Sequence, residues 1–254
     1  MNAPLVAVAH GSRDPRSAAT IRGLLDVVRS VRPELDVRTA FLDLSAPALG
    51  DVLDAVHSDG HGSAVVVPLL LGHAYHASVD IPTAVTEAQE RNPLFRVRTA
   101  EVLGPDQRLR EAAWRRLLQT GADPDDERLG VVLAGAGSAH PPANRLVADV
   151  AETWQRHTAW AGAVAAFAAA ADPDVPAAVE RLRAAGARRF AVASWFLAPG
   201  RLPDRALERA RESAPSPLLA ETMGADRGIA DLVLSRYDAA LGAPGQQPRL
   251  SRVG

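Results

Sequence analysis

Two histidines and one aspartate in the first half of the chain, His10, Asp43 and His76, could together bind a metal ion or accept protons. Imidazole nitrogens and a carboxylate oxygen suit divalent iron, cobalt, nickel or zinc, and three such ligands leave coordination positions open for a substrate. Imidazole also titrates near neutral pH, so the same groups can take up protons. A single histidine at a strand end is, however, often a structural group, and an aspartate can cap a helix.

The second half of the chain favours the chemical interpretation of these three residues. At positions 126 residues further on, the sequence has Ala136, Ala169 and Leu202. Structural side chains have no evident reason to be lost together, whereas the three members of one site do. We therefore expect the function in the first half, facing the second.

The spacing of 126 residues also relates glycines, prolines and aromatic residues, with no gap needed. This agreement predicts an internal duplication and two lobes of similar fold. The matched pairs are Gly11 with Gly137, Pro15 with Pro141, Phe41 with Phe167, Pro47 with Pro173, and the apolar run 64–71 with 190–197.

Short apolar runs alternate with amphipathic stretches in both halves, and this order predicts doubly wound parallel sheets. Expected strands in the first half are 5–9, 37–42, 64–71 and 95–102, and expected helices are 17–31, 47–57, 81–91 and 106–118. Expected strands in the second half are near 129–134, 161–167, 189–197 and 217–221, and expected helices are near 142–157, 174–185, 203–213 and 226–241.

The fold class predicted is thus α/β, with two tandem lobes. We place an active lobe at 1–119, a polar linker at 120–127 and a degenerate lobe at 128–241. Residues 242–254, rich in proline, glycine and glutamine, are expected to be a disordered tail.

Composition excludes several classes of chemistry. Every basic residue is arginine, which excludes a Schiff-base lysine and a P-loop lysine. Cysteine is absent, which excludes disulfides, thiolate metal sites and iron–sulfur clusters. The net charge of −2 gives no general affinity for nucleic acid or membranes, and no signal peptide or membrane-spanning run is recognised. We expect a cytoplasmic protein with no prosthetic group.

The three candidate residues should converge. His10 ends the first expected strand, Asp43 follows the second, and His76 lies in the loop after the third. In parallel α/β sheets, ligands bind at the carboxyl ends of the strands, so these loops open at one edge. His73, in the same loop as His76, is a less certain member of the group.

Three motifs in this half resemble those of the sirohydrochlorin chelatases, of the class II tetrapyrrole chelatase group. They are AHGSRDP at residues 9–15, FLDLSAP at 41–47 and PLLLGHAYHASVDIP at 68–82. Their order and spacing cover most of the first half, and the second half resembles the same fold without the motifs. The family often has glutamate where this chain has Asp43, which puts direct metal ligation by the shorter side chain in doubt.

The resemblance implies a lyase that inserts a divalent metal into sirohydrochlorin without ATP, for siroheme or cobalamin biosynthesis. Fe²⁺ is favoured as the metal and Co²⁺ is the alternative. It implies that His10 and His76 hold the metal and receive pyrrole protons, with Asp43 as a proton relay. The fused second half would form the other wall of the cleft, so that a monomer could be functional.

Sirohydrochlorin is a polycarboxylate, and guanidinium groups pair well with carboxylates. We therefore expect Ser12, Arg13 and Arg201 to bind it, with Arg205 a weaker candidate. Two other functions remain open: a tetrapyrrole or metal carrier without turnover, and a histidine-phosphatase-like enzyme. The second would need an arginine directly before His10, where this chain has Ala9.

Overall fold

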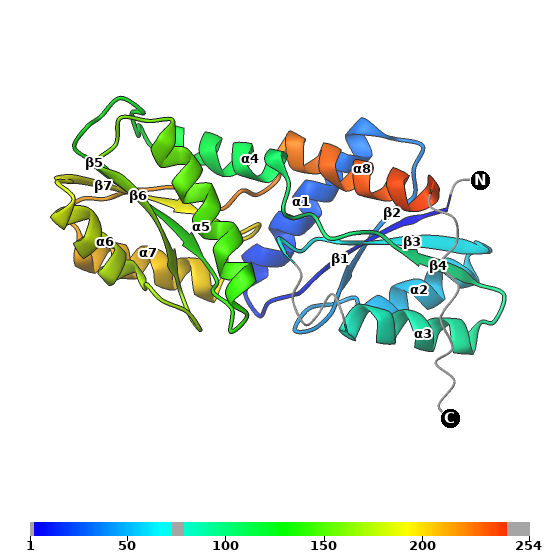
Figure 1. Ribbon diagram of the computed structural model, residues 1–254. Helices are drawn as coiled ribbons and strands as arrows, with labels where there is room; N and C mark the ends of the chain where they lie inside the picture. The colour runs from blue at the N-terminus through cyan, green and yellow to red at the C-terminus, as the bar shows by residue number, and fades with distance from the viewer. Residues whose placement is uncertain (1–2, 73–78, 243–254) are drawn as a thin grey trace.

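The structure, a computed structural model, describes residues 3–72 and 79–242 and contains two four-stranded parallel sheets (Figure 1). The strand orders are β2-β1-β3-β4 and β6-β5-β7-β8, which are the same order in the two halves. The strands are β1 (Leu5–Ala9), β2 (Val37–Phe41), β3 (Ser63–Pro68), β4 (Arg96–Thr99), β5 (Leu129–Gly135), β6 (Gly162–Phe167), β7 (Arg189–Ser194) and β8 (Leu218–Leu219). This confirms the predicted fold class.

Helices connect the parallel strands and cover both faces of each sheet, so β1 and β5 are buried along their whole length and β3 and β7 at all but their first residue. The helices are α1 (Pro15–Val31), α2 (Leu49–Ser58), α3 (Ile81–Arg91), α4 (Gln107–Leu118), α5 (Pro141–Arg156), α6 (Val175–Ala184), α7 (Arg201–Ser213) and α8 (Arg227–Gly242). None of the helices in the described part of the chain has the length and hydropathy needed to span a membrane.

The last helix of each half packs on the sheet of the other half. Helix α4 contacts β7 of the second sheet, whereas α8 contacts β3, β4 and α1 of the first. Figure 1 shows α8 beside α1 and α4 over the second sheet. The Trp114 ring on α4 lies 5.3 Å from the rings of Trp154 and Trp160, and the Tyr237 hydroxyl on α8 donates to the carbonyl of Ala3 at 2.6 Å.

This exchange modifies the predicted organisation of the chain. Segments 1–119 and 128–241 each contain one sheet, but the last helix of each segment packs on the sheet of the other. The division of the chain into two lobes at 120–127 stays a prediction. Residues 120–127 themselves pack on the second half, where the backbone carbonyl of Asp123 accepts a hydrogen bond from the indole N–H of Trp160 at 2.8 Å. The expected tail begins at Gly242, which ends α8, and residues 243–254 lie outside the described residues.

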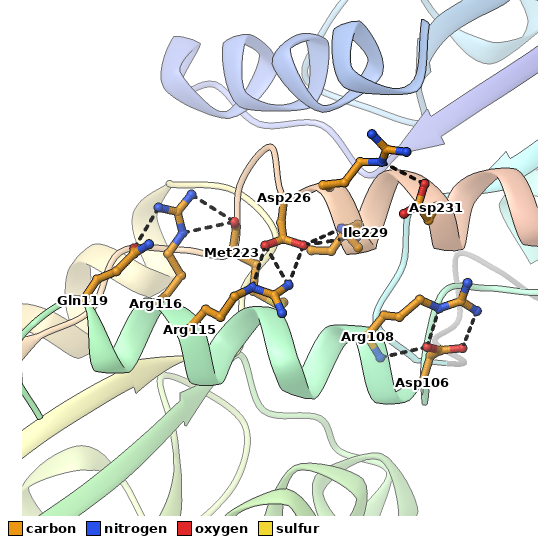
Figure 2. Close-up of polar contacts among 11 residues, drawn as sticks. Asp106, Arg108, Arg115, Arg116, Gln119, Met223, Asp226, Ile229 and Asp231 are labelled. Carbon is orange, nitrogen blue, oxygen red and sulfur yellow. Dashed lines mark hydrogen bonds and ion pairs between the residues drawn. The ribbon is translucent and has the colours of Figure 1, made fainter. Parts of the chain in front are cut away.

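Arginine–aspartate contacts fix the two exchanged helices to each other (Figure 2). The carboxylate of Asp226 accepts hydrogen bonds from the Arg115 guanidinium of α4 at 2.8–3.2 Å. It also accepts from the backbone N–H groups of Gly228 and Ile229 in the first turn of α8. One side chain therefore both caps α8 and holds it against α4.

Backbone geometry supports the internal duplication. Gly11 and Gly137 have φ values of +96° and +85°, and Leu44 and Ala170 have φ values of 58° and 57°. These are unusual conformations, and each pair is separated by 126 residues. The two halves therefore share loop geometry as well as strand order.

The prediction that this spacing never changes is wrong after the third strand of each half. Val66 and Val192, which are 126 residues apart, accept hydrogen bonds from Ala100 and Ala220, which are only 120 apart. The second half therefore lacks six residues between its third and fourth strands. Leu202 is the second residue of α7, as Pro82 is of α3, so the structure pairs Leu202 with a position 120 residues earlier.

Candidate functional site

His10 and Asp43 lie side by side at the carboxyl edge of the first sheet. His10 directly follows β1, and Asp43 comes two residues after the neighbouring strand β2. The backbone N–H of Asp43 donates to the carbonyl of His10 at 3.0 Å, which continues the pairing of the two strands beyond their ends. Both side chains are exposed. The structure thus brings together two of the three predicted residues.

Gly11 allows the two loops to approach this closely. A Cβ atom at this position would lie 1.7 Å from the carbonyl oxygen of Asp43, and the φ of +96° is one that residues with a side chain rarely adopt. Gly137 makes the same approach to Ala169 in the second half, at 1.8 Å. Both halves therefore share the close contact between these loops, but only the first half has an imidazole and a carboxylate there, on His10 and Asp43.

Ser12 and Ser45 tie the same two loops together by reciprocal hydrogen bonds. The N–H of Ser12 donates to Ser45 Oγ at 3.1 Å, and that hydroxyl donates to the carbonyl of Ser12 at 2.8 Å. Ser12 Oγ accepts from the N–H of Asp14 at 3.1 Å, just before α1. Ser12 therefore has a clear structural role, and its predicted contact with substrate remains a prediction. Ser45 was not predicted from the sequence, because no pattern around it indicates this contact.

The second half approaches this edge through the start of α7. A Cβ atom on Gly200, which precedes α7, would lie 3.7 Å from Ser12 Oγ. Arg16 of α1 forms ion pairs with both Asp14 and Asp204 of α7. These contacts place the amino end of α7 beside the loop after β1, as expected if the second half lines the site.

Arg16 was not among the residues predicted from the sequence. Hydrogen bonds to Asp14 and then to Asp204 raise the pKa of its guanidinium, and hydrogen bonds from Arg16 lower the pKa of the Asp14 carboxyl. The sequence DPR at 14–16 could have indicated the local pair with Asp14, but nothing in it pointed to Asp204, which is distant along the chain.

The predicted arginines lie near this edge and are exposed. Arg13 follows Ser12, and Arg201 is the first residue of α7. Neither guanidinium has an ion-pair or hydrogen-bond partner among residues 3–72 and 79–242, so both could bind an anionic ligand. Arg205 instead donates to the carbonyl of Ala168 at 3.3 Å.

His76, the third predicted residue, lies outside the described residues, as does His73. Within the described part of the chain, no group of three histidine or acidic residues could hold a metal ion. Of the predicted site residues, the structure describes His10 and Asp43 at this edge, which carry one imidazole and one carboxylate. The same two groups can accept protons from a bound molecule.

Comparisons with known proteins bear on the family and the fold of the chain. A family model described as CbiX matches residues 4–120 and again residues 130–240. The "Sirohydrochlorin ferrochelatase" of Priestia megaterium is 26% identical over 246 residues, which cover 94% of this chain and 91% of that protein. The "Sirohydrochlorin cobaltochelatase" of the same organism is 26% identical over 211 residues, which cover 81% and 67% respectively.

Among solved structures, "SirB from Bacillus subtilis with Fe3+" matches with a TM-score of 0.78 at 23% identity, covering 95% of this chain and 96% of that one. This match independently supports the two-sheet fold. The family match confirms the resemblance carried by the three sequence motifs. Because the model matches nearly the whole chain in two successive copies, the chain belongs to the CbiX family.

Proposed function

We propose that this protein inserts a divalent metal ion into sirohydrochlorin without ATP, as a lyase of siroheme or cobalamin biosynthesis. The observation that carries the proposal is the joining of His10 and Asp43 at the carboxyl edge of the first sheet. Relatives named as sirohydrochlorin ferrochelatase and cobaltochelatase support the substrate. The metal is a substrate of this reaction and leaves with the product.

The reaction exchanges one divalent cation for two protons on the pyrrole nitrogens. In this proposal His10 and His76 hold the metal, and imidazole nitrogens accept the protons as the metal enters the ring. Asp43 relays those protons to solvent. The support is that Asp43 is exposed and that its backbone N–H donates to the carbonyl of His10, which holds the two loops together. No bond to a phosphate is made or broken, so no nucleotide is required.

Arg13 and Arg201 are proposed to bind substrate carboxylates from the two halves, with Ser12 between them. The support is that both guanidinium groups are exposed and unpaired among the described residues, while Ser12 approaches Gly200. The macrocycle would lie against the edge that the loop after β1 and the start of α7 form together. A single chain would then form the whole site, and a monomer could be active.

Fe²⁺ is the favoured metal and Co²⁺ the alternative. The two imidazoles of His10 and His76 accept either ion. The relatives cover both metals in their names. Rates measured with each metal under anaerobic conditions, with and without ATP, test the choice.

The proposal is tested by following the absorbance of sirohydrochlorin with catalytic amounts of protein. We expect repeated turnover by the parent, and a loss of about 100-fold or more in His10→Ala, because proton acceptance and metal delivery are both removed. His61→Ala is the matched control, since His61 comes just before β3 at the opposite edge of the same sheet. Equal turnover by His10→Ala and the parent would refute the assignment, and a stoichiometric change without turnover would favour a carrier.

A further inference from the structure

Leu44, the residue after Asp43, combines two features that are unusual for a leucine. Its side chain is 45% exposed, and its backbone has a φ of 58°, in the left-handed region that non-glycine residues seldom occupy. Such conformations cost free energy and persist where the surroundings impose them. Leu44 is not a member of any of the hydrophobic core clusters formed by the described residues.

Hydrogen bonds hold the residues on both sides of Leu44. The N–H of Leu44 donates to Asp43 Oδ1 at 2.7 Å, the N–H of Asp43 donates to His10, and Ser45 is tied to Ser12. Leu44 is therefore held between two anchored residues at the carboxyl edge of β2. A side chain at this point is presented next to His10 and Asp43 in a fixed position.

The second half shows that the fold does not need a leucine here. Ala170 occupies the equivalent position with a φ of 57°, in a loop with the same hydrogen bonds between strand ends. An alanine therefore satisfies this backbone. The additional carbons of Leu44 belong to none of the core clusters that the described residues form, and they occur in the half that keeps His10 and Asp43.

We infer that Leu44 is a substrate-contact residue whose side chain packs against the apolar face of the tetrapyrrole macrocycle. The inference rests on the proposed function and adds an apolar contact to it. Carboxylates at the rim of the ring can be bound by arginines such as Arg13, but the ring face itself is apolar and gains from contact with a hydrocarbon side chain. Leu44 supplies one beside the metal-delivery residues.

Such a contact predicts a specific kinetic effect. Packing on the ring is present in both the bound substrate and the transition state, so its loss raises KM and leaves kcat nearly unchanged. Covering the exposed 45% of a leucine corresponds to a change in affinity of about three- to tenfold. The backbone should be undisturbed by Leu44→Ala, because Ala170 adopts the same conformation.

The test compares the parent with Leu44→Ala, Leu44→Met and Leu94→Ala. Leu94 is the matched control, because it is 83% exposed but lies just before β4, at the opposite edge of the sheet. Binding of metal-free sirohydrochlorin is measured by fluorescence titration, turnover with Co²⁺ gives KM and kcat, and thermal unfolding checks the fold. We expect Leu44→Ala to raise Kd and KM by about three- to tenfold, Leu44→Met to retain most of the affinity, and Leu94→Ala to match the parent.

Separate binding and turnover measurements distinguish the two levels of the argument. If the parent binds sirohydrochlorin without inserting metal, the proposed function fails, and the Kd values of the variants still decide the role of Leu44. The inference is overturned if the parent does not bind sirohydrochlorin, if Leu44→Ala keeps Kd within about twofold of the parent, or if kcat falls while KM is unchanged. The last result would mean that Leu44 acts by positioning Asp43.

Discussion

Replacing Gly11 by alanine should damage the site far more than the equivalent change in the second half, although both should destabilise the protein alike. The new Cβ would lie 1.7 Å from the carbonyl oxygen of Asp43, a separation at which one of the two loops must move. In Gly137→Ala the corresponding distance to Ala169 is 1.8 Å. The internal duplication therefore provides a control that differs only in the side chains nearby.

The cost in stability can be worked from this geometry. A left-handed φ costs an alanine about 1–2 kcal/mol. Movement of the Asp43 loop weakens its 3.0 Å hydrogen bond to His10, which is worth about 1 kcal/mol. We expect a loss of about 2–3 kcal/mol in the free energy of unfolding for Gly11→Ala, and a similar loss for Gly137→Ala, where Ala169 donates to Ala136 at the same distance.

The functional effects should differ. A displacement of about 1 Å between reacting groups can reduce a rate about 100-fold, so Gly11→Ala should lose about that factor in kcat. Gly137→Ala moves a loop that carries no ligand and should keep kcat within a few-fold of the parent. Urea denaturation gives the stabilities, and anaerobic metal insertion well below the unfolding temperature gives the rates. Equal losses of kcat in the two variants, or an unchanged rate in Gly11→Ala, would refute the reasoning.

Three further outcomes are expected. Asp226→Ala should lower the free energy of unfolding by about 2 kcal/mol, since it removes both the cap of α8 and the ion pair with Arg115; a double-mutant cycle with Arg115→Ala separates the two effects. The free energy of unfolding should be constant near neutral pH and fall below about pH 4, because hydrogen bonds from arginines lower the pKa values of Asp106 and Asp238 in the folded state. The contribution of these two carboxylates is present above their unfolded pKa of about 3.9 and is lost as the pH falls through the folded values. Urea midpoints measured across the pH range test this. Calorimetric titration with Co²⁺ should give one site per chain, and two equivalent sites would contradict the assignment of the second half as degenerate.

Sequence patterns predicted the buried central strands well and the edge strands less well. Strand β1 coincides with the expected 5–9, since five buried apolar residues in a row are typical of a covered parallel strand. The expected strand 95–102 is shorter, with β4 limited to Arg96–Thr99 and mostly exposed. An edge strand pairs on one side only, so the apolar residues that follow it can belong to a loop.

The exchange of α4 and α8 could not be predicted from the sequence. An amphipathic pattern identifies which face of a helix is buried but not which sheet covers that face. The contacts that fix the exchange, such as Asp226 with Arg115, join residues far apart along the chain. The closeness of His10 and Asp43 was easier to predict, because they follow adjacent parallel strands whose carboxyl ends lie at the same edge of the sheet.

The two halves differ in their loops after the third strand, and this difference explains their separate roles better than the loss of single ligands does. The second half has six fewer residues between Val192 and Ala220 than the first has between Val66 and Ala100, and α7 starts soon after β7 ends. The shorter connection brings the amino end of α7 beside Ser12, where Asp204 binds Arg16. The longer connection in the first half includes His76. The two sheets keep the same strand order, so the length of this one connection is enough to let the amino end of α7 pack against the loop after β1.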